Sequence, residues 1–189
     1  IYIQPHLNGL RPDFVLLHPR RGVAVYEVKD WNLHGLDYFV DHDRGGPRLM
    51  GHRDGKAFSL GARDPVATID RYKREIHGLY VPSLSGTGGF GSIIAGVIFT
   101  SATTRDAEDL LHPLRKAQGH TAYPKLYPVI GVELLGRQDD EALRTLLSAA
   151  RRNDDRMSDR VATDLRHWLV EPAFSRDQRV PLAQLLTAK

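Results

Sequence analysis

The sequence predicts an α/β fold with a helical extension at the C-terminal end of the chain. Short segments rich in Val, Ile and Leu alternate with segments that have helical spacing, and turn residues separate them. After Gly136 the pattern becomes helical only. The chain has 189 residues and 41% apolar side chains, so it can bury a sizeable core in one domain, alone or with a helical appendage.

The first thirty residues predict three strands that form a meander or hairpin. The segments 1–4, 13–18 and 23–29 are rich in β-branched residues, leucine and aromatics, and turn residues at 8–9 and 19–22 separate them. From residue 32 to residue 60 the chain is polar and rich in glycine. We expect an irregular excursion there, with or without a small hairpin.

A capped helix opens the second half of the predicted core. Asp64 provides its N-cap and Pro65 its first turn, and helical spacing continues to about His77. The apolar segment 93–100 then predicts a strand.

The remaining elements are mainly helical. Thr103 or Thr104 caps a short helix that runs through Leu111 and ends at His112-Pro113, and the segment 129–135 predicts one more strand. Two helices follow over 139–152 and 158–170, and then a connector that contains proline. We therefore expect a core over 1–136, a helical extension over 137–170 and a linker over 171–189.

Composition excludes several functional classes. The chain has no cysteine, so any metal has to be held by oxygen or imidazole, and a thiolate nucleophile is excluded. Its longest apolar stretch, 93–99, is too short to span a bilayer, and no leader of the secretory kind opens the chain. We expect a soluble, cytoplasmic protein without a membrane partner. Its 26 basic and 23 acidic side chains give a net charge of +3, which is compatible with a polyanion such as DNA.

Three charged side chains in the first hairpin carry the strongest functional signal. Asp13 stands at the head of one apolar strand, and Glu27 and Lys29 lie within the next. Because strand side chains alternate between faces, Glu27 and Lys29 share one face. If residues 20–22 form a three-residue loop with Gly22 at positive φ, Asp13 lies opposite Lys29 and diagonal to Glu27. A two-residue loop would place Asp13 on the other face, and we favour the longer loop.

Two carboxylates on a rigid hairpin suit Mg²⁺ or Mn²⁺, which prefer oxygen ligands and retain waters. A lysine beside the ion can orient the attacking water or stabilise charge on a phosphate, so the chemistry is phosphodiester hydrolysis. The alternative is a purely structural Glu-Lys pair on the solvent face of a strand.

The same residues resemble a known family. Arg-Pro-Asp-Phe-Val-Leu-Leu at 11–17, Gly-Val-Ala-Val-Tyr-Glu-Val-Lys-Asp-Trp at 22–31 and Asp-Pro-x(6)-Tyr-Lys at 64–73 resemble the nuclease-related domain (NERD) branch of the PD-(D/E)XK nucleases, over about residues 8–135. The resemblance implies a restriction-endonuclease-like core, with a mixed central β-sheet flanked by helices. It also implies that Asp13, Glu27 and the backbone carbonyl of Val28 bind the metal, and that Lys29 is catalytic.

Some features depart from that family or extend the resemblance. Related exonuclease-type members carry Gln-x-x-x-Tyr on the helix after the core motif; here Tyr72 matches and Thr68 does not. Members usually add an acidic residue from a helix before the first strand, and this sequence begins after that point, so we expect an incomplete acidic set. Residues 181–189 resemble the lead-in to a superfamily 1 helicase, which implies a covalently linked helicase downstream. The alternative function is a catalytically weak DNA-binding or docking module for that helicase.

Several side chains are candidates for contact with DNA. On the helix after Asp64 they are Arg71, Tyr72, Lys73 and Arg74, and at the hairpin tip they are Arg20 and Arg21. A solvated helix face explains the basic residues of the helix equally well, and at the hairpin tip we favour an ordinary polar turn. Trp31 either stacks on a base or covers the edge of the sheet, and we favour the second.

Overall fold

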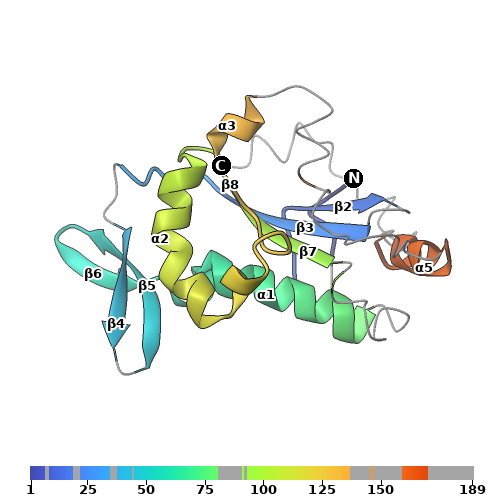
Figure 1. Cartoon of the computed structure of the whole chain (residues 1–189), viewed down its shortest axis with the longest axis horizontal. Coiled ribbons are helices and arrows are strands. Elements are labelled where there is room, and N and C mark those ends of the chain that lie inside the picture. The colour runs from blue at the N-terminus through green and yellow to red at the C-terminus, as the bar shows by residue number, and fades with distance from the viewer. Residues whose placement is uncertain are drawn as a thin grey trace.

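The computed structural model describes residues 1–6, 9–18, 22–34, 38–43, 45–80, 91, 93–136, 146 and 159–169. Its centre is a mixed sheet of five strands in the order β1-β2-β3-β7-β8 (Figure 1). These strands are β1 (Tyr2–Ile3), β2 (Phe14–His18), β3 (Gly22–Lys29), β7 (Ile93–Phe99) and β8 (Val129–Ile130). The strands β1, β2 and β3 are antiparallel, whereas β3, β7 and β8 are parallel. The predicted α/β class is confirmed.

The register of the β2–β3 hairpin differs from the predicted register by two residues. Phe14 pairs with Tyr26 and His18 with Gly22, so continuing the ladder puts Asp13 opposite Glu27 and not opposite Lys29. Gly22 has the expected positive φ of 97°, but it lies within the ladder. The two registers place the same side chains on the same face, so the apolar pattern cannot distinguish between them.

Helices cover the sheet. They are α1 (Pro65–Glu75), α2 (Thr104–Ala117), α3 (Val132–Leu135) and α5 (Asp159–Leu169). A π-helical turn, Ile76–Tyr80, follows α1, and Gly61–Arg63 and His120–Ala122 are short 3₁₀ helices. One face of the sheet, which carries Val15, Val25 and Val97, packs against α1, α2 and α5. The other face, which carries Tyr26 and Ile98, packs against Leu134 and Leu146. No helix in these described stretches is long and apolar enough to cross a bilayer.

Local signals placed the beginnings of two helices correctly. The Asp64 carboxylate accepts hydrogen bonds from the amides of Val66 and Ala67, and Thr103 caps α2 through the amide of Asp106. The predicted end of α2 is wrong, because Pro113 lies inside the helix, where packing of Leu111 and Leu114 overrides the proline signal.

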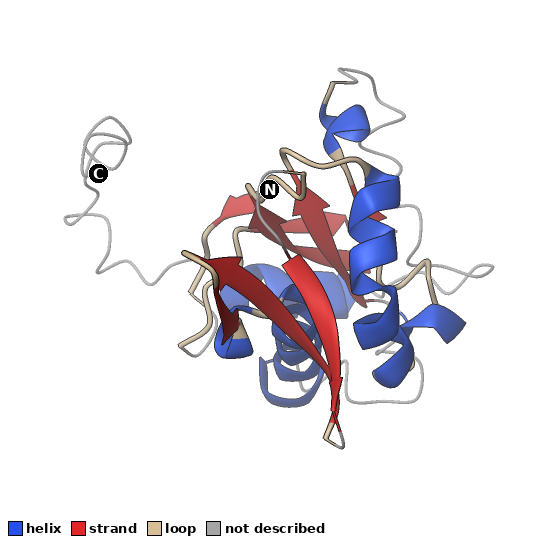
Figure 2. Cartoon of the chain, turned by 90° about the vertical axis from the view of Figure 1, so that its left-hand side faces the viewer, coloured by secondary structure: helices blue, strands red, loops and turns tan. Residues whose placement is uncertain are grey.

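Two further predictions need correction. The predicted strand over 129–135 is only β8, because the chain turns into α3 after Gly131. The segment 32–60 is not irregular: β4 (Tyr38–Asp43), β5 (Gly46–Arg53) and β6 (Lys56–Ser59) form a separate antiparallel sheet. This smaller sheet lies beside α2 and stands nearest the viewer in Figure 2, in front of the larger sheet. Its strands are mostly exposed, so they lack the apolar alternation by which strands are predicted.

The remaining helical prediction is confirmed in part. α5 matches the helix expected over 158–170. The helix expected over 139–152 lies outside the described residues apart from Leu146, as does the linker over 171–189.

Candidate active site

Asp13 lies immediately before β2 and is held by bonds to two neighbouring segments. Its backbone carbonyl accepts a hydrogen bond of 2.8 Å from the amide of Gln4. Its carboxylate oxygen Oδ2 accepts one of 2.7 Å from the amide of Val28 on β3. The carboxylate therefore accepts the hydrogen bond that a backbone carbonyl would accept if the β2–β3 ladder continued to Val28. This bond to the sheet sets the orientation of the Asp13 side chain.

Glu27 and Lys29 form the second part of the site. Lys29 Nζ donates to Glu27 Oε1 at 2.6 Å, and the two side chains are only 16% and 14% exposed. Because Asp13, Glu27 and Lys29 have the same parity in the hairpin register, all three lie on the face covered by α1. The predicted trio is thus brought together, although in a different register.

Tyr72 of α1 completes the cluster from the opposite side. Its hydroxyl donates to Glu27 Oε2 at 2.8 Å and lies 3.3 Å from the carbonyl oxygen of Arg11. Burial raises the pKa of Tyr72, and the hydrogen bond to Glu27 and the negative charges of Glu27 and Asp13 raise it further. The phenol therefore stays protonated and remains a donor across the ordinary pH range.

Trp31 supports the lysine. Lys29 Nζ lies 5.7 Å from the centre of the Trp31 ring, within the range of a cation–π contact. The ring stacks on Tyr38 at 4.6 Å and meets Phe99 edge to face at 6.0 Å. Of the two alternatives for Trp31, the structure supports packing, at the ends of the central strands β3 and β7 and not over an edge strand.

The backbone of Val28 adds an oxygen to the same place. Thr100 donates to the carbonyl of Lys29 on the β7 side, whereas the Val28 amide points to Asp13 on the β2 side. Because the N–H and C=O of one strand residue point the same way, the Val28 carbonyl also faces the β2 side, beyond the last ladder pair.

The site offers only oxygen atoms as ligands for a metal ion. Within the described ranges, no three or more Asp, Glu and His side chains group in a way that could hold an ion. The set here is two carboxylates and one carbonyl. Mg²⁺ and Mn²⁺ commonly bind one or two carboxylates and complete their shell with water and phosphate. The oxygen donors therefore fit such an ion, provided that it replaces Lys29 at Glu27 Oε1.

The predicted DNA contacts have different outcomes. Lys73 is fully buried and donates to the carbonyl of Ile93 at 2.6 Å, so the expectation that it faces a phosphate backbone is wrong. Tyr72 is buried and directed at Glu27, so it does not form a free DNA-contacting surface. Arg71 and Arg74 are exposed, and Arg74 pairs with Asp70. Arg20 and Arg21 lie outside the described residues.

Comparisons with family models, curated proteins and solved structures give no match to this chain. The geometry of the site and its chemistry are therefore the basis for assigning a function.

Proposed function

We propose that this chain is a divalent-metal-dependent deoxyribonuclease with a restriction-endonuclease-like core. The observation that carries the proposal is the convergence of Asp13, Glu27 and Lys29 on one face at the end of the hairpin, with Tyr72 bonded to Glu27. A structural ion pair alone would not require the additional carboxylate or the buried phenol. The mixed sheet with α1 on this face supports the proposed fold.

In this proposal, Asp13, Glu27 and the Val28 carbonyl would hold Mg²⁺ or Mn²⁺, and the bound ion would polarise a phosphate and acidify a coordinated water. Lys29 places a positive charge beside the phosphate oxygens, where negative charge increases in the transition state. Tyr72 and the Val28 amide fix the two carboxylates. Hydrolysis forms a P–O bond from the water oxygen and breaks the P–O bond to the departing sugar oxygen, which leaves with a proton.

The direct test is cleavage of supercoiled plasmid and end-labelled linear DNA with Mg²⁺, Mn²⁺ or EDTA. We expect metal-dependent cutting by the wild type and a loss of about 10²- to 10³-fold in kcat for Lys29→Met. Asp13→Asn should lose both cutting and the binding of Mn²⁺ in a calorimetric titration. Asp41→Asn, which changes an exposed carboxylate on β4, is the matched control. Equal cleavage by Asp13→Asn and the wild type would exclude this site.

The second candidate is a DNA-binding module of low catalytic activity, attached to a helicase. It is favoured by the pair of carboxylates without a further acidic or His ligand among the described residues, and by the short Lys29–Glu27 bond. DNA binding without cutting in Mn²⁺, by a longer chain that includes upstream and downstream sequence, would support it. A linked helicase remains part of both proposals. Residues 181–189, which carry the resemblance to its lead-in, lie outside the residues that the structure describes.

A further inference from the structure

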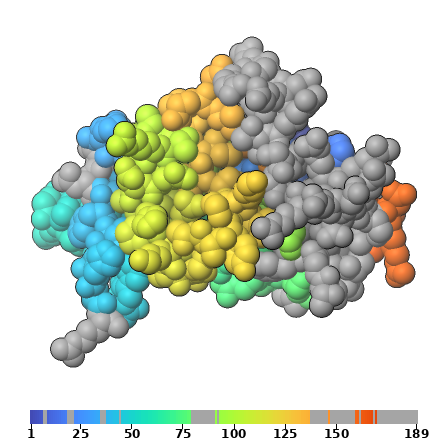
Figure 3. Space-filling view, in the orientation of Figure 1, coloured from blue at the N-terminus to red at the C-terminus, as the bar shows by residue number. Residues whose placement is uncertain are grey.

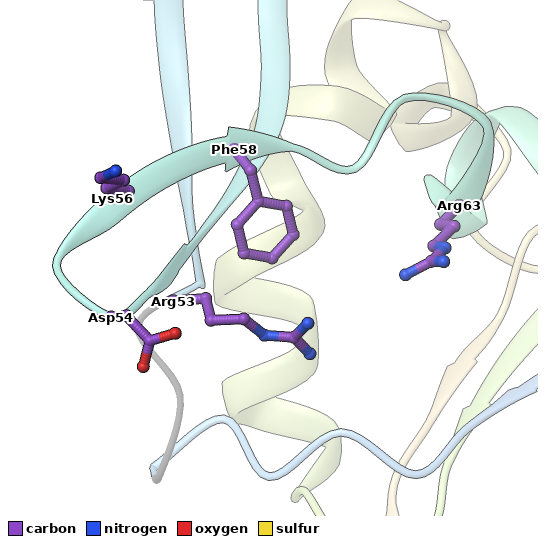
Figure 4. Close-up of a pocket in the computed structure, with 5 residues that line it drawn as sticks. All are labelled: Arg53, Asp54, Lys56, Phe58 and Arg63. Carbon is purple, nitrogen blue, oxygen red and sulfur yellow. The ribbon is translucent and has the colours of Figure 1, made fainter.

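The smaller sheet carries a basic hollow with an aromatic wall, separate from the candidate active site. Its volume is about 590 Å³, and its lining residues are Arg53, Asp54, Lys56, Phe58 and Arg63. In Figure 4 the Phe58 ring projects from β6 into the hollow, the Arg53 side chain runs below it, and the Arg63 guanidinium points toward it from the other side. The small sheet forms the left-hand edge of the molecule, beside α2, in the space-filling view (Figure 3).

The hairpin geometry brings these side chains to one face. Arg53 pairs with Lys56, and Gly51 with Phe58, so all four residues share the face that also carries the buried Leu49. The Asp54–Gly55 turn is tight and has positive φ at both residues, 52° and 73°. One end of this face packs on the core, and the other end forms the wall of the hollow.

The tip of the Phe58 ring lies against Gly51 on the neighbouring strand β5. A Cβ atom at Gly51 would lie 2.9 Å from the tip of the ring, so the absence of a side chain there lets the ring approach the β5 backbone. Phe58 is nevertheless 39% exposed. A large aromatic ring that is partly exposed at the surface can stack on another flat group.

The charge of the hollow selects the kind of ligand. Three cations face a single carboxylate, and none of Arg53, Lys56 and Arg63 has an ion-pair partner among the described residues. By contrast, Arg48 on the same strand pairs with Asp43. Guanidinium groups on either side of an aromatic ring suit a ligand that has an anionic backbone and flat, unpaired rings.

A row of contacts connects the hollow with the candidate active site. Lys29 contacts Trp31, and Trp31 stacks on Tyr38. Tyr38 is in register with Gly51, which is in register with Phe58 on the next strand. The row comprises two strand spacings and two ring contacts, a path that several nucleotides of a single strand can cover.

We propose that Arg53, Phe58 and Arg63 form a binding site for single-stranded DNA, in which a base stacks on Phe58 and the arginines contact the flanking phosphates. This inference rests on the proposed nuclease function and names the form of its substrate next to the cleavage site. A duplex keeps its bases stacked on one another, so it cannot present a free base to the ring.

Binding is tested by fluorescence anisotropy in EDTA, with the whole chain and a labelled oligothymidylate of about a dozen nucleotides. The competitors are an abasic strand of equal length, a duplex and polyglutamate. Phe58→Ala should weaken binding of oligothymidylate by about 5- to 100-fold and leave binding of the abasic strand unchanged. Arg53→Gln combined with Arg63→Gln should weaken both and reduce the slope of log affinity against log salt by about 1.4.

The controls separate a loss of the site from a loss of the fold. Phe58→Trp, unlike Phe58→Ala, should keep the wild-type preference for oligothymidylate over the abasic strand. Arg48→Gln should bind like the wild type, because Arg48 lies on the same strand but on the opposite face. The proposal is overturned if Phe58→Ala binds oligothymidylate normally, or if the duplex or polyglutamate competes as well as oligothymidylate. The latter result would indicate a duplex site or an acidic protein partner.

The outcomes also distinguish this inference from the proposed function. If no DNA is cut but binding depends on Phe58, the single-strand site stands and the nuclease proposal fails. If DNA is cut at the Asp13 site while binding is independent of Phe58, only this inference fails.

Discussion

At the scale of single residues, Glu27 is the centre of the candidate active site. One carboxylate oxygen accepts from the ammonium of Lys29 and the other accepts from the phenol of Tyr72. Hydrogen bonds to a charged group contribute about 1.5 to 3 kcal/mol each, and restricted access of water strengthens them. The carboxylate is therefore fixed before any ligand binds, which is what precise placement of a metal ion or a phosphate requires.

Tyr72→Phe removes the hydroxyl and keeps the buried ring. We expect the affinity for Mn²⁺, or the cleavage activity, to fall by about 10- to 100-fold, because the orientation of Glu27 loses one of its supports. The measurements are calorimetric titration with Mn²⁺ and cleavage as a function of Mn²⁺ concentration. Tyr123→Phe, which changes an exposed tyrosine, is the control. Unchanged metal dependence in Tyr72→Phe would show that the phenol has only a packing role.

At the scale of elements, α1 joins the active-site face to a buried polar cluster. Next to Tyr72, Lys73 donates to Ile93 at the start of β7 and lies 4.5 Å from the centre of the Tyr127 ring. His120 stacks on that ring and lies 3.2 Å from the Asp70 carboxylate. The helix is thus positioned by polar contacts on one side and by its apolar side chains on the other.

The buried lysine predicts a specific pH dependence of stability. Burial lowers the pKa of Lys73 to about 7, with Asp70 opposing the shift, whereas the unfolded chain has the ordinary value of 10.5. Between these values the unfolded state binds more protons, so the free energy of unfolding rises with pH, by at most about 1.4 kcal/mol per pH unit. Burial also lowers the pKa of His120 from its ordinary value of 6.5. This histidine therefore reduces the free energy of unfolding only below about pH 6.5.

Urea unfolding of Lys73→Met between about pH 7.5 and 9.5 tests this contribution. The variant should lose most of the upward slope that the wild type shows. The slope is the relevant quantity, because the Ile93 carbonyl also loses its partner and lowers the absolute stability. Lys116→Met changes an exposed lysine in α2 and should keep the wild-type slope. Parallel curves for Lys73→Met and the wild type would contradict the assignment.

Local signals and packing explain which elements were predictable. The caps of α1 and α2 depend on one side chain and the amides that follow it, so Asp64 and Thr103 could be recognised from the sequence. Pro113 and the segment after Ile130 depend on tertiary packing. Both Tyr72 and Lys73 fit the apolar spacing of α1, and only the structure shows that both are buried.

At the scale of the whole molecule, the two sheets differ in how their strands are protected. All seven residues of β7 are buried, and β3 is paired along both sides. All four residues of β6 are exposed, and among the described strands β6 pairs with β5 alone. Because local opening is easiest where few apolar contacts are lost, the small sheet should open without the large one.

Native-state hydrogen exchange measures this difference directly. Amides of β3 and β7 should exchange only on global unfolding, whereas those of β6 should exchange by local opening and much faster. Binding of oligothymidylate to the basic hollow should slow hydrogen exchange of the amides of β5 and β6 and leave exchange of the β7 amides unchanged. Equal protection of β6 and β7 would mean that the two sheets unfold as one unit.

The residues of the candidate active site could be grouped from the sequence because alternate residues of a strand lie on the same face. Asp13, Glu27 and Lys29 lie on one face in both the predicted and the observed register of the hairpin. The wrong register therefore still placed the three side chains together. The basic hollow was not predictable. Nothing in the sequence groups its arginines with Phe58, and they converge only because β5, β6 and the turn before α1 fold together.

The bond between the Val28 amide and Asp13 also limits how this aspartate can bind a cation. Oδ2 is already directed into the sheet, and Oδ1 has no hydrogen bond to a described residue, so Asp13 is available to an ion through one oxygen only. An asparagine at this position would keep its oxygen on the amide and turn its –NH₂ group toward the ion. Asp13→Asn is therefore a close structural mimic that repels the metal, and its crystal structure should superpose on that of the wild type.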